Sequence, residues 1–550
     1  MEHSLKFKVI GYLAKKFKRA LRPLAQLYRR YLRISKRREY HSWAVNNERQ
    51  CFVDGSSPDS IKFSLVSAIY NTDPTHLREM IYSVINQHYQ NWELILVNVS
   101  DKSESIDFVE SCSEIDNRIK VVKAKNVGIS ENTNIGIASA VGDYIVFIDH
   151  DDTIHPCAIH SMIKAVKDGA DVIYTDEDKI THDGQRHFQP LCKPDWSPHL
   201  FENLNYINHL TVIKKELIDS VDGLRAECNG SQDYDLLWRV IDRFNPKIVH
   251  IPSVLYHWRA AKTSTAASIS NKKYIFAAGT KTVEDHFNRQ KIDVKVESMF
   301  GKPGFYKVQY PSTKYSIVIG QVIPNRQPAA ARWVEKLMSM QDYNDCEIII
   351  GSWYLKYASK SKKVDATIIP DTESEYMIAA FGQAIYSTVV VCNHAIVPRA
   401  STMLGELASV ANASDSLVQP LVVGPDGTII DAGFVDSNYG IQPLFKDIKI
   451  GDNTFFGDVE WVRDIRQVSG LVYAVNKDHI TQRHTKKSLS RIHVSTDIKS
   501  ILWAHSVFEY IGPLDHNVPL PTFSPLLSQA MYEIPMSNSG WDQQMEREDE

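Results

Sequence analysis

Short apolar runs alternate with helical patterns over residues 61–174, and this alternation constrains the fold more than any other feature. Apolar runs at residues 63–69, 92–97 and 119–122 predict strands, because each is short and bounded by polar or turn residues. Apolar residues between the first two runs recur at helical spacing, behind Asp73 as an N-cap. Since parallel strands are usually joined by helical crossovers, the pattern predicts an α/β fold with a parallel sheet.

The same pattern returns about 250 residues later in the chain. Residues 315–319 echo residues 63–67, and residues 341–350 echo residues 87–96. Similar segments at similar separations predict a second domain of the same fold. The predicted parts are a basic helical segment (1–45), a first domain (61–262), a connector (263–313), a second domain (314–510) and a disordered tail (511–550).

Three carboxylates, those of Asp149, Asp151 and Asp152, directly follow the apolar run 143–148. The carboxyl ends of strands form the edge of an open α/β sheet where ligands bind. Because like charges this close repel one another, we expect a bound cation to hold them, and carboxylate oxygens suit Mg or Mn. The alternative is an acidic turn before the next helix, which begins near Pro156.

The second domain lacks this acidic cluster. Its predicted strand at residues 388–391 corresponds to the run before Asp149 and places Val391, Asn393 and His394 where the three acids stand. A hard divalent ion prefers carboxylate oxygens to these groups. We therefore predict one metal-binding domain and one copy that kept only its fold.

Two further side chains are candidates for chemistry. Asp233 falls in the first turn of a predicted helix capped by Ser231, where the helix dipole favours acids. The same dipole keeps a carboxylate ionised, as a general base requires, so both interpretations stay open. His257 follows the apolar run 251–255, where a single histidine is more often a packed edge residue than a ligand. The loop predicted at 188–198 either lines a sugar site or only packs.

The formal net charge of −4 hides a basic N-terminus. Residues 1–40 hold thirteen Lys or Arg and two Glu, a balance of +11, among apolar residues near helical spacing. Such a segment can lie on an anionic membrane; a solvated arm and a nucleic-acid tail are the alternatives. The rest of the chain carries −15, so nucleic acid is the least supported partner.

Cysteine usage and hydropathy point to a compartment. Seven cysteines without ligand spacing indicate a reducing environment. Neither a signal peptide nor an apolar run of bilayer length is evident. We therefore expect a cytoplasmic protein, peripheral at the inner face of the plasma membrane.

Six short motifs occur in order along the first domain: Tyr70-Asn71, Asn126-Val127-Gly128-Ile129-Ser130 with Asn134, Asp149-His150-Asp151-Asp152, Tyr174-Thr175-Asp176-Glu177-Asp178, Ser231-Gln232-Asp233-Tyr234-Asp235-Leu236, and Tyr256-His257-Trp258-Arg259. With these motifs, residues 61–262 resemble the family 2 glycosyltransferases of GT-A fold, in particular those that build bacterial surface polysaccharides such as O-antigen and capsule. Residues 314–510 resemble the second transferase domain often fused behind the first, and residues 424–433 match it best. The resemblance implies an α/β protein with two GT-A domains in tandem, the second degenerate.

The resemblance also implies roles for individual residues. Asp149 and Asp151 would hold a Mn or Mg ion together with the donor's ribose and diphosphate, and His257 would be a further metal ligand. Asp233 would be the catalytic base. The residues bordering the nucleotide would be Tyr70, Asn71, Asn98, Asn126 and Asn134. Asn98 stands where the family usually has an acid. Because an Asn side chain can still form hydrogen bonds with a pyrimidine base, the implied donor is a sugar linked to UDP or dTDP.

The implied activity is that of an inverting, metal-dependent glycosyltransferase. It would move a sugar from a nucleotide-sugar donor to a polyprenyl-linked or growing cell-surface glycan, with other glycosyltransferases and an anionic membrane surface as partners and no nucleic acid. A non-catalytic glycan-binding subunit is one alternative, because the second domain has lost its acids. A nucleotidyltransferase is another, and the Asp233 and His257 motifs argue against it.

Overall fold

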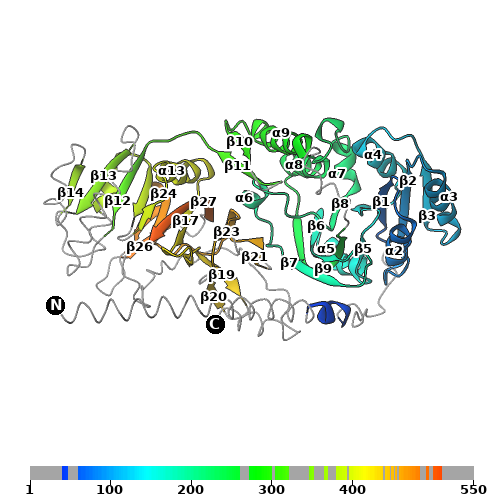
Figure 1. Ribbon diagram of the computed structural model, residues 1–550. Helices are drawn as coiled ribbons and strands as arrows, with labels where there is room; N and C mark the ends of the chain where they lie inside the picture. The colour runs from blue at the N-terminus through cyan, green and yellow to red at the C-terminus, as the bar shows by residue number, and fades with distance from the viewer. Residues whose placement is uncertain are drawn as a thin grey trace.

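The computed structural model contains two α/β units that lie side by side (Figure 1). The predicted basic segment before residue 40 and the predicted tail after residue 510 lie outside the described residues. The structure describes residues 40–46, 60–260, 272–299, 304–320, 346–351, 364–368, 379–392, 396–437, 440–445, 448–450, 453–454, 457–483, 491–494 and 499–510.

The first unit is built on a nine-stranded sheet of order β3-β2-β1-β4-β8-β6-β9-β5, with β7 paired to β6. Its strands are β1 (Phe63–Ile69), β2 (Trp92–Asn98), β3 (Ile119–Lys123), β4 (Tyr144–Phe147), β5 (Thr153–Ile154), β6 (Val172–Ile180), β7 (His187–Leu191), β8 (Thr211–Lys214) and β9 (Ile248–Arg259). Strands β1 to β4 pair in parallel, as predicted. No strand was predicted at residues 211–214, where β8 runs antiparallel between β4 and β6.

Apolar cores fill both faces of this sheet, because successive residues of β1 and β2 point to opposite sides. The helices are α2 (Pro74–Ile85), α3 (Ser103–Ser111), α4 (Ile129–Ser139), α5 (Ala158–Lys167), α6 (Pro198–Phe201), α7 (Lys215–Ser220), α8 (Gln232–Phe244) and α9 (Lys272–Gln290). The carboxylate of Asp73 caps α2 as predicted, accepting a hydrogen bond from the Thr75 amide at 2.8 Å. The predicted connector thus contains α9, which packs on α8, and a hairpin of β10 (Lys295–Ser298) and β11 (Tyr306–Gln309).

The second unit is built on a ten-stranded sheet of order β14-β13-β12-β15-β24-β17-β27-β16, with β18 on β17 and β23 on β27. Its strands are β12 (Tyr315–Ile319), β13 (Cys346–Gly351), β14 (Val364–Ile368), β15 (Thr388–Cys392), β16 (Ile396–Pro398), β17 (Leu417–Val423), β18 (Ile429–Asp431), β23 (Arg463–Ile465), β24 (Val472–Asn476) and β27 (Ser500–Tyr510), and its helix is α13 (Met403–Ser414). Three hairpins complete it: β19 (Phe434–Ser437) with β20 (Gly440–Pro443), β21 (Asn453–Thr454) with β22 (Gly457–Asp458), and β25 (Ile480–Arg483) with β26 (Arg491–Val494).

The two sheets share one topology. From β3 to β5 and from β14 to β16, the strand order and the parallel or antiparallel sense of every pair are the same. A buried contact also recurs: the Ser64 hydroxyl donates to the Glu93 carboxylate at 2.6 Å, and the Ser316 hydroxyl donates to the Glu347 carboxylate. The second sheet therefore repeats the first in architecture and in one polar core contact.

Strand register corrects one predicted correspondence between the units. Val66 of β1 lies opposite Phe147, and Val318 of β12 lies opposite Val391. Counting forward from these pairs, Asn393 takes the place of Asp149 and Ala395 that of Asp151, two positions from the predicted match. Val391 is instead a buried residue of β15, whereas 393–395 lie outside the described residues. Under either register no carboxylate occupies these positions in the sequence.

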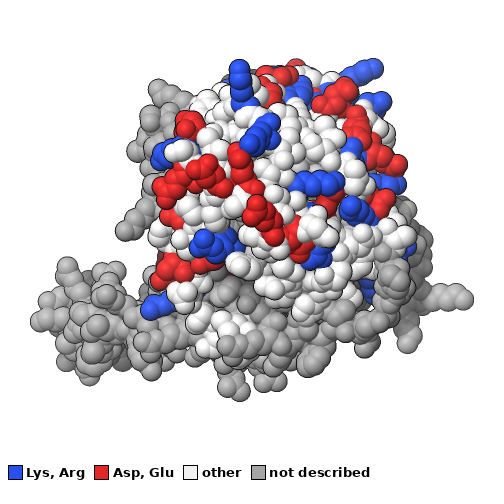
Figure 2. Space-filling view, turned by 90° about the vertical axis from the view of Figure 1, so that its right-hand side faces the viewer, with Lys and Arg blue, Asp and Glu red and all other residues white. Residues whose placement is uncertain are grey.

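We find no helix suited to crossing a bilayer in the part of the chain that the structure describes. Figure 2 shows the end face of the first unit, on which acidic and basic side chains are interspersed. Nucleic acid is recognised by a continuous basic stripe. The described part of this face does not present one.

Candidate active site

The three clustered acids after β4 have two different environments. Asp152 is buried, and its carboxylate accepts hydrogen bonds from the Tyr256 hydroxyl at 2.5 Å and the Arg259 amide at 2.7 Å. Burial, with the charges of Asp149 and Asp151, raises the pKa of Asp152. The side chains of Asp149 and Asp151 are 57% and 29% exposed. The expectation that a cation holds all three acids is therefore wrong for Asp152, which fastens the turn to β9, while the other two face solvent.

Asp233 lies half-buried in the first turn of α8. Ser231 is the N-cap residue, but its side chain makes no capping hydrogen bond. The Asp233 carboxylate accepts a hydrogen bond from the Tyr234 amide at 2.8 Å. It also accepts hydrogen bonds from the side-chain amides of Asn205, at 3.4 Å, and Asn208. These donors hold the carboxylate in one orientation.

His209 lies close to Asp149 and directly follows Asn208, which contacts Asp233, and sequence reasoning missed it. Its Nε2 atom is 3.8 Å from the Asp149 Oδ2 atom, and its ring stacks on Tyr256 with 4.9 Å between centroids. Burial raises the pKa of Asp233, the His209 charge lowers it, and the Asp149 charge raises it, so the three groups interact electrostatically. No spacing in the sequence marks His209, because only the packing of the segment before β8 brings it to this edge.

A buried ion pair supports the His209 backbone. The His209 amide donates to the Glu177 Oε2 atom at 2.5 Å, and the Lys193 ammonium donates to the same oxygen at 3.1 Å. Burial lowers the pKa of Lys193, and Glu177 opposes this shift. The loop predicted at 188–198 therefore packs beneath the candidate site through Lys193, and its first residues belong to β7.

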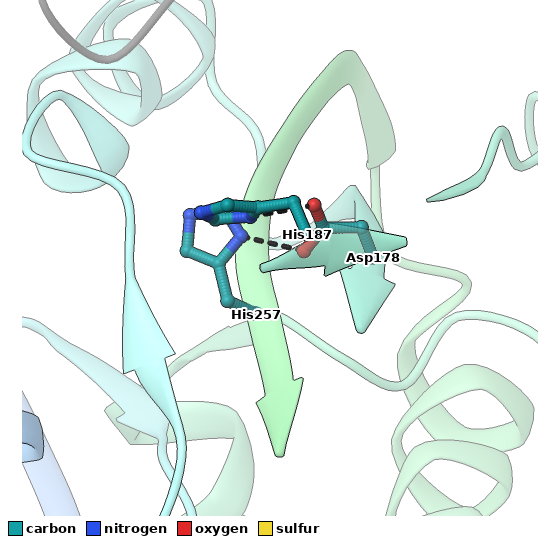
Figure 3. Close-up of side chains that lie close together, drawn as sticks. All are labelled: Asp178, His187 and His257. Carbon is teal, nitrogen blue, oxygen red and sulfur yellow. Dashed lines mark hydrogen bonds and ion pairs between the residues drawn. The ribbon is translucent and has the colours of Figure 1, made fainter. Parts of the chain in front are cut away.

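His257 belongs to a separate buried cluster with Asp178 and His187 (Figure 3). The Asp178 carboxylate lies 2.6 Å from His257 Nδ1 and 2.9 Å from His187 Nδ1, and it accepts a hydrogen bond from the Tyr40 hydroxyl at 2.7 Å. Burial alone would raise the pKa of Asp178, but His257 and His187 lower it to about 2. Helical residues 40–46 are thus fastened to the first unit at this cluster.

The described residues contain one group of three metal-type ligands, and it is this cluster rather than the predicted set of Asp149, Asp151 and His257. Each imidazole Nδ1 atom is at hydrogen-bond distance from Asp178, so protons occupy those positions. Metal-binding histidines commonly donate one ring N–H to a carboxylate and ligate through the other nitrogen. The cluster therefore fits an oriented His257 imidazole better than it fits a metal seated among the three residues.

Tyr70 and Asn71 follow β1 and meet Asp101, which follows β2. The Tyr70 hydroxyl donates to Asp101 at 3.0 Å and the Asn71 side-chain amide at 2.6 Å. These two hydrogen bonds lower the pKa of Asp101. Tyr70 is 48% exposed, so its ring offers a stacking surface beside an ionised carboxylate.

The three asparagines predicted to border the nucleotide differ in their exposure and in their hydrogen bonds. Asn98 is buried at the end of β2, and its side-chain oxygen accepts from the Ser100 amide at 3.2 Å. Asn126 is exposed. The Asn134 side chain donates to the Leu224 carbonyl and accepts from the Leu224 amide, both at 2.8 Å. Asn134 therefore joins α4 to the 224 loop.

Part of the first unit matches the model of a known protein family. Residues 64–215 match the family model described as "Glycosyl transferase family 2". The "Uncharacterized protein y4gI" of Sinorhizobium fredii is 33% identical over 398 residues, covering 68% of this chain and 43% of that protein. The "O-antigen biosynthesis protein RfbC" of Myxococcus xanthus is 27% identical over 435 residues, covering 76% of this chain and 34% of that protein. The chain thus spans less than half the length of these relatives.

Among solved structures, that of S. aureus TarS 1–349 in complex with UDP-GlcNAc aligns with this chain, and the alignment covers 42% of this chain and 67% of that chain. The sequence identity is 16% and the TM-score 0.35, a likeness too low to carry an argument. The family match and the strand order of the first unit support a GT-A-like α/β fold.

Proposed function

We propose that this chain, whose residues 64–215 match the model of family 2 glycosyltransferases, transfers a sugar from a nucleoside-diphosphate donor to a hydroxyl of a cell-surface glycan. One observation carries the proposal: the Asp233 carboxylate accepts a hydrogen bond from Asn208, and the next residue, His209, lies 3.8 Å from Asp149, so two acids far apart in sequence meet at one segment. A solvent-facing carboxylate at a strand end suits a metal-bound diphosphate, and a fixed, half-buried carboxylate suits proton transfer.

Asp233 is the proposed base. Its carboxylate takes the proton of the acceptor hydroxyl while the hydroxyl oxygen bonds to the anomeric carbon, and the bond from that carbon to the diphosphate oxygen breaks. This single displacement inverts the anomeric centre. Burial raises the pKa of Asp233, which makes the carboxylate a better proton acceptor. Hydrogen bonds from Asn205 and Asn208 orient the Asp233 carboxylate.

Asp149 and Asp151 are the proposed ligands of a Mn or Mg ion, since their exposed oxygens are of the type that these ions prefer. When bound, the ion supplies positive charge that stabilises the leaving diphosphate. We propose His257 as a further ligand, with Asp178 fixing the tautomer that presents Nε2.

The proposed nucleotide border consists of Tyr70, Asn71, Asn98 and Asn126, with Asp101 added by the geometry described above. The proposed donors are UDP- or dTDP-linked sugars. A polyprenyl-linked or growing glycan is the proposed acceptor, and the Myxococcus relative named for O-antigen biosynthesis supports this class.

The proposed setting is the inner face of the plasma membrane. The basic segment 1–45 would bind its anionic lipids, and other glycosyltransferases would act beside this chain. The second unit is the proposed degenerate copy, because the positions equivalent to Asp149 and Asp151 carry no carboxylate in its sequence.

The experiment follows release of nucleoside diphosphate from UDP- and dTDP-sugars by the full chain, with Mn and with EDTA. We expect Mn-dependent release that Asp151→Asn reduces by removing a metal ligand and that Asp233→Asn reduces about 100-fold or more, within the range for lost general-base catalysis. Asp219→Asn is the matched control, because this exposed acid pairs with Lys215 on the surface.

Two results would contradict the proposal. Release that is equal in Asp233→Asn and Asp219→Asn would remove the base from the mechanism. No release from any donor, with glycan binding intact, would favour the non-catalytic subunit, and pyrophosphate formation from a nucleoside triphosphate would favour a nucleotidyltransferase.

A further inference from the structure

We propose that the second unit positions the catalytic edge of the first through Asp464 of β23. The inference rests on the proposed function, since it assigns Asp464 as a positioning residue for the Asp233 base. Asp464 holds α6, and the chain leaving α6 carries Asn205, Asn208 and His209 to the site. A unit whose sequence carries no carboxylate at the positions equivalent to Asp149 and Asp151 thereby keeps a part in catalysis.

The contact between Asp464 and α6 is built from a buried charge. The Asp464 carboxylate accepts a hydrogen bond from the Ser197 hydroxyl at 2.5 Å and lies 2.9 Å from His199 Nδ1. The Asp464 amide also donates to the Ser197 hydroxyl oxygen at 3.2 Å. Ser197 is in turn the N-cap of α6, accepting from the Leu200 amide. Because a buried charge persists only where it is paired, this contact fixes the start of α6 against β23.

Further contacts hold the same short helix from the same side. The Asn203 side-chain oxygen lies 3.0 Å from His505 Nε2 of β27. Trp461, which precedes β23, is buried in the apolar core of the first unit together with Leu200 and Phe201. Polar and apolar contacts from the second unit thus converge on residues 197–203.

From α6 the chain reaches the base by two routes. The Tyr234 hydroxyl donates to the Phe201 carbonyl, and the two rings pack with 4.9 Å between centroids. Tyr234 is the neighbour of Asp233 and donates its amide to that carboxylate. On the other route, Asn205 and Asn208 follow α6 directly and donate to Asp233. A displacement of α6 would therefore move both Asp233 and the two asparagines that orient its carboxylate.

The test uses the full chain with Asp464→Ala, Asp464→Asn and the matched control Glu406→Gln. Glu406 of α13 pairs with Lys307 at 3.1 Å and accepts from the Ser506 hydroxyl at 3.2 Å; the Gln side chain can still accept from Ser506, so the control removes only the charge that faces Lys307. The first readout is hydrogen exchange of the amides in residues 197–210, which needs no activity. We expect at least tenfold faster exchange in Asp464→Ala, unchanged exchange in Glu406→Gln, and an intermediate effect in Asp464→Asn, whose amide oxygen still accepts from Ser197.

The second readout separates kcat from donor binding. We expect Asp464→Ala to lower kcat about 10- to 100-fold, because small misplacements of catalytic groups have effects of this size, while the donor dissociation constant stays within about twofold. Exchange that is equal in Asp464→Ala and Glu406→Gln would overturn the inference. Should the wild-type chain transfer no sugar, the proposed function fails, yet the exchange experiment still decides whether Asp464 positions this segment.

Discussion

Replacing Tyr256 by Phe tests whether a charged hydrogen bond holds the acidic turn against β9. The variant removes one buried hydroxyl and keeps the shape of the ring, so no large cavity forms. That hydroxyl donates to the Asp152 carboxylate at 2.5 Å and accepts from the Asp149 amide at 3.3 Å. Hydrogen bonds to charged groups contribute about 1.5–3 kcal/mol, so we expect the first unit to lose about 2 kcal/mol of unfolding free energy.

Thermal unfolding measures this loss. In a unit of about 200 residues, 1 kcal/mol shifts the Tm by about 2–4 °C, so Tyr256→Phe is expected to lower the Tm by about 4–8 °C. Tyr144→Phe is the matched control, because its buried hydroxyl donates to the neutral carbonyl of Ala170 at 2.8 Å and is worth about 1 kcal/mol. Equal losses in the two variants would refute the reasoning, because the charge on Asp152 would then contribute nothing.

Two further predictions concern the buried histidines. Asp178→Asn is expected to weaken Mn affinity about tenfold, because Asp178 orients His257. Isothermal titration calorimetry measures this affinity, and an unchanged value in the variant would show that Asp178 does not orient a metal ligand. The second concerns pH. Burial opposes protonation of His199, but Asp464 raises its pKa above 6.5, so its stabilisation is complete below pH 6.5 and is lost as pH rises through the raised value. The pKa of Asp464, which burial would raise, is lowered below 3.8 by His199, so its share is present above pH 3.8 and lost only at more acidic pH. Thermal stability measured across this range is expected to fall on the alkaline side in the wild type and less so in His199→Gln; parallel curves would argue against the pair.

Much of the first unit follows from sequence pattern, because apolar runs at strand length leave few alternatives. The bounds of β1, β2 and β3 match the predicted runs to within a residue. Strand β8 was not predicted, because its four residues form a run too short to be told apart from a loop by its pattern. In the second unit, Val391 is the last of three consecutive valines in strand β15, which look alike in the sequence, so the predicted match slipped by two positions.

The candidate site was predictable only where chemistry and spacing coincide. Asp149 and Asp151 stood out as clustered acids, yet the pattern could not tell them from Asp152, whose role depends on contacts with β9. His209 carries no such signal. It reaches Asp149 only because Glu177 and the segment before β8 fold back against the sheet.

The two units share a core contact, whereas the acids Asp149 and Asp151 of the first have no carboxylate counterpart in the sequence of the second. The buried contact between Ser64 and Glu93 recurs between Ser316 and Glu347. In each unit the Glu carboxylate also accepts a hydrogen bond from a backbone amide just before the following strand, that of Val141 before β4 and that of Ile385 before β15. Core contacts are required for folding, whereas residues at the edge are required only for chemistry. A copy that loses its edge acids but keeps its core therefore still folds and still presents a rigid surface. Such a surface can hold a neighbouring segment, as β23 holds α6, without any chemistry of its own.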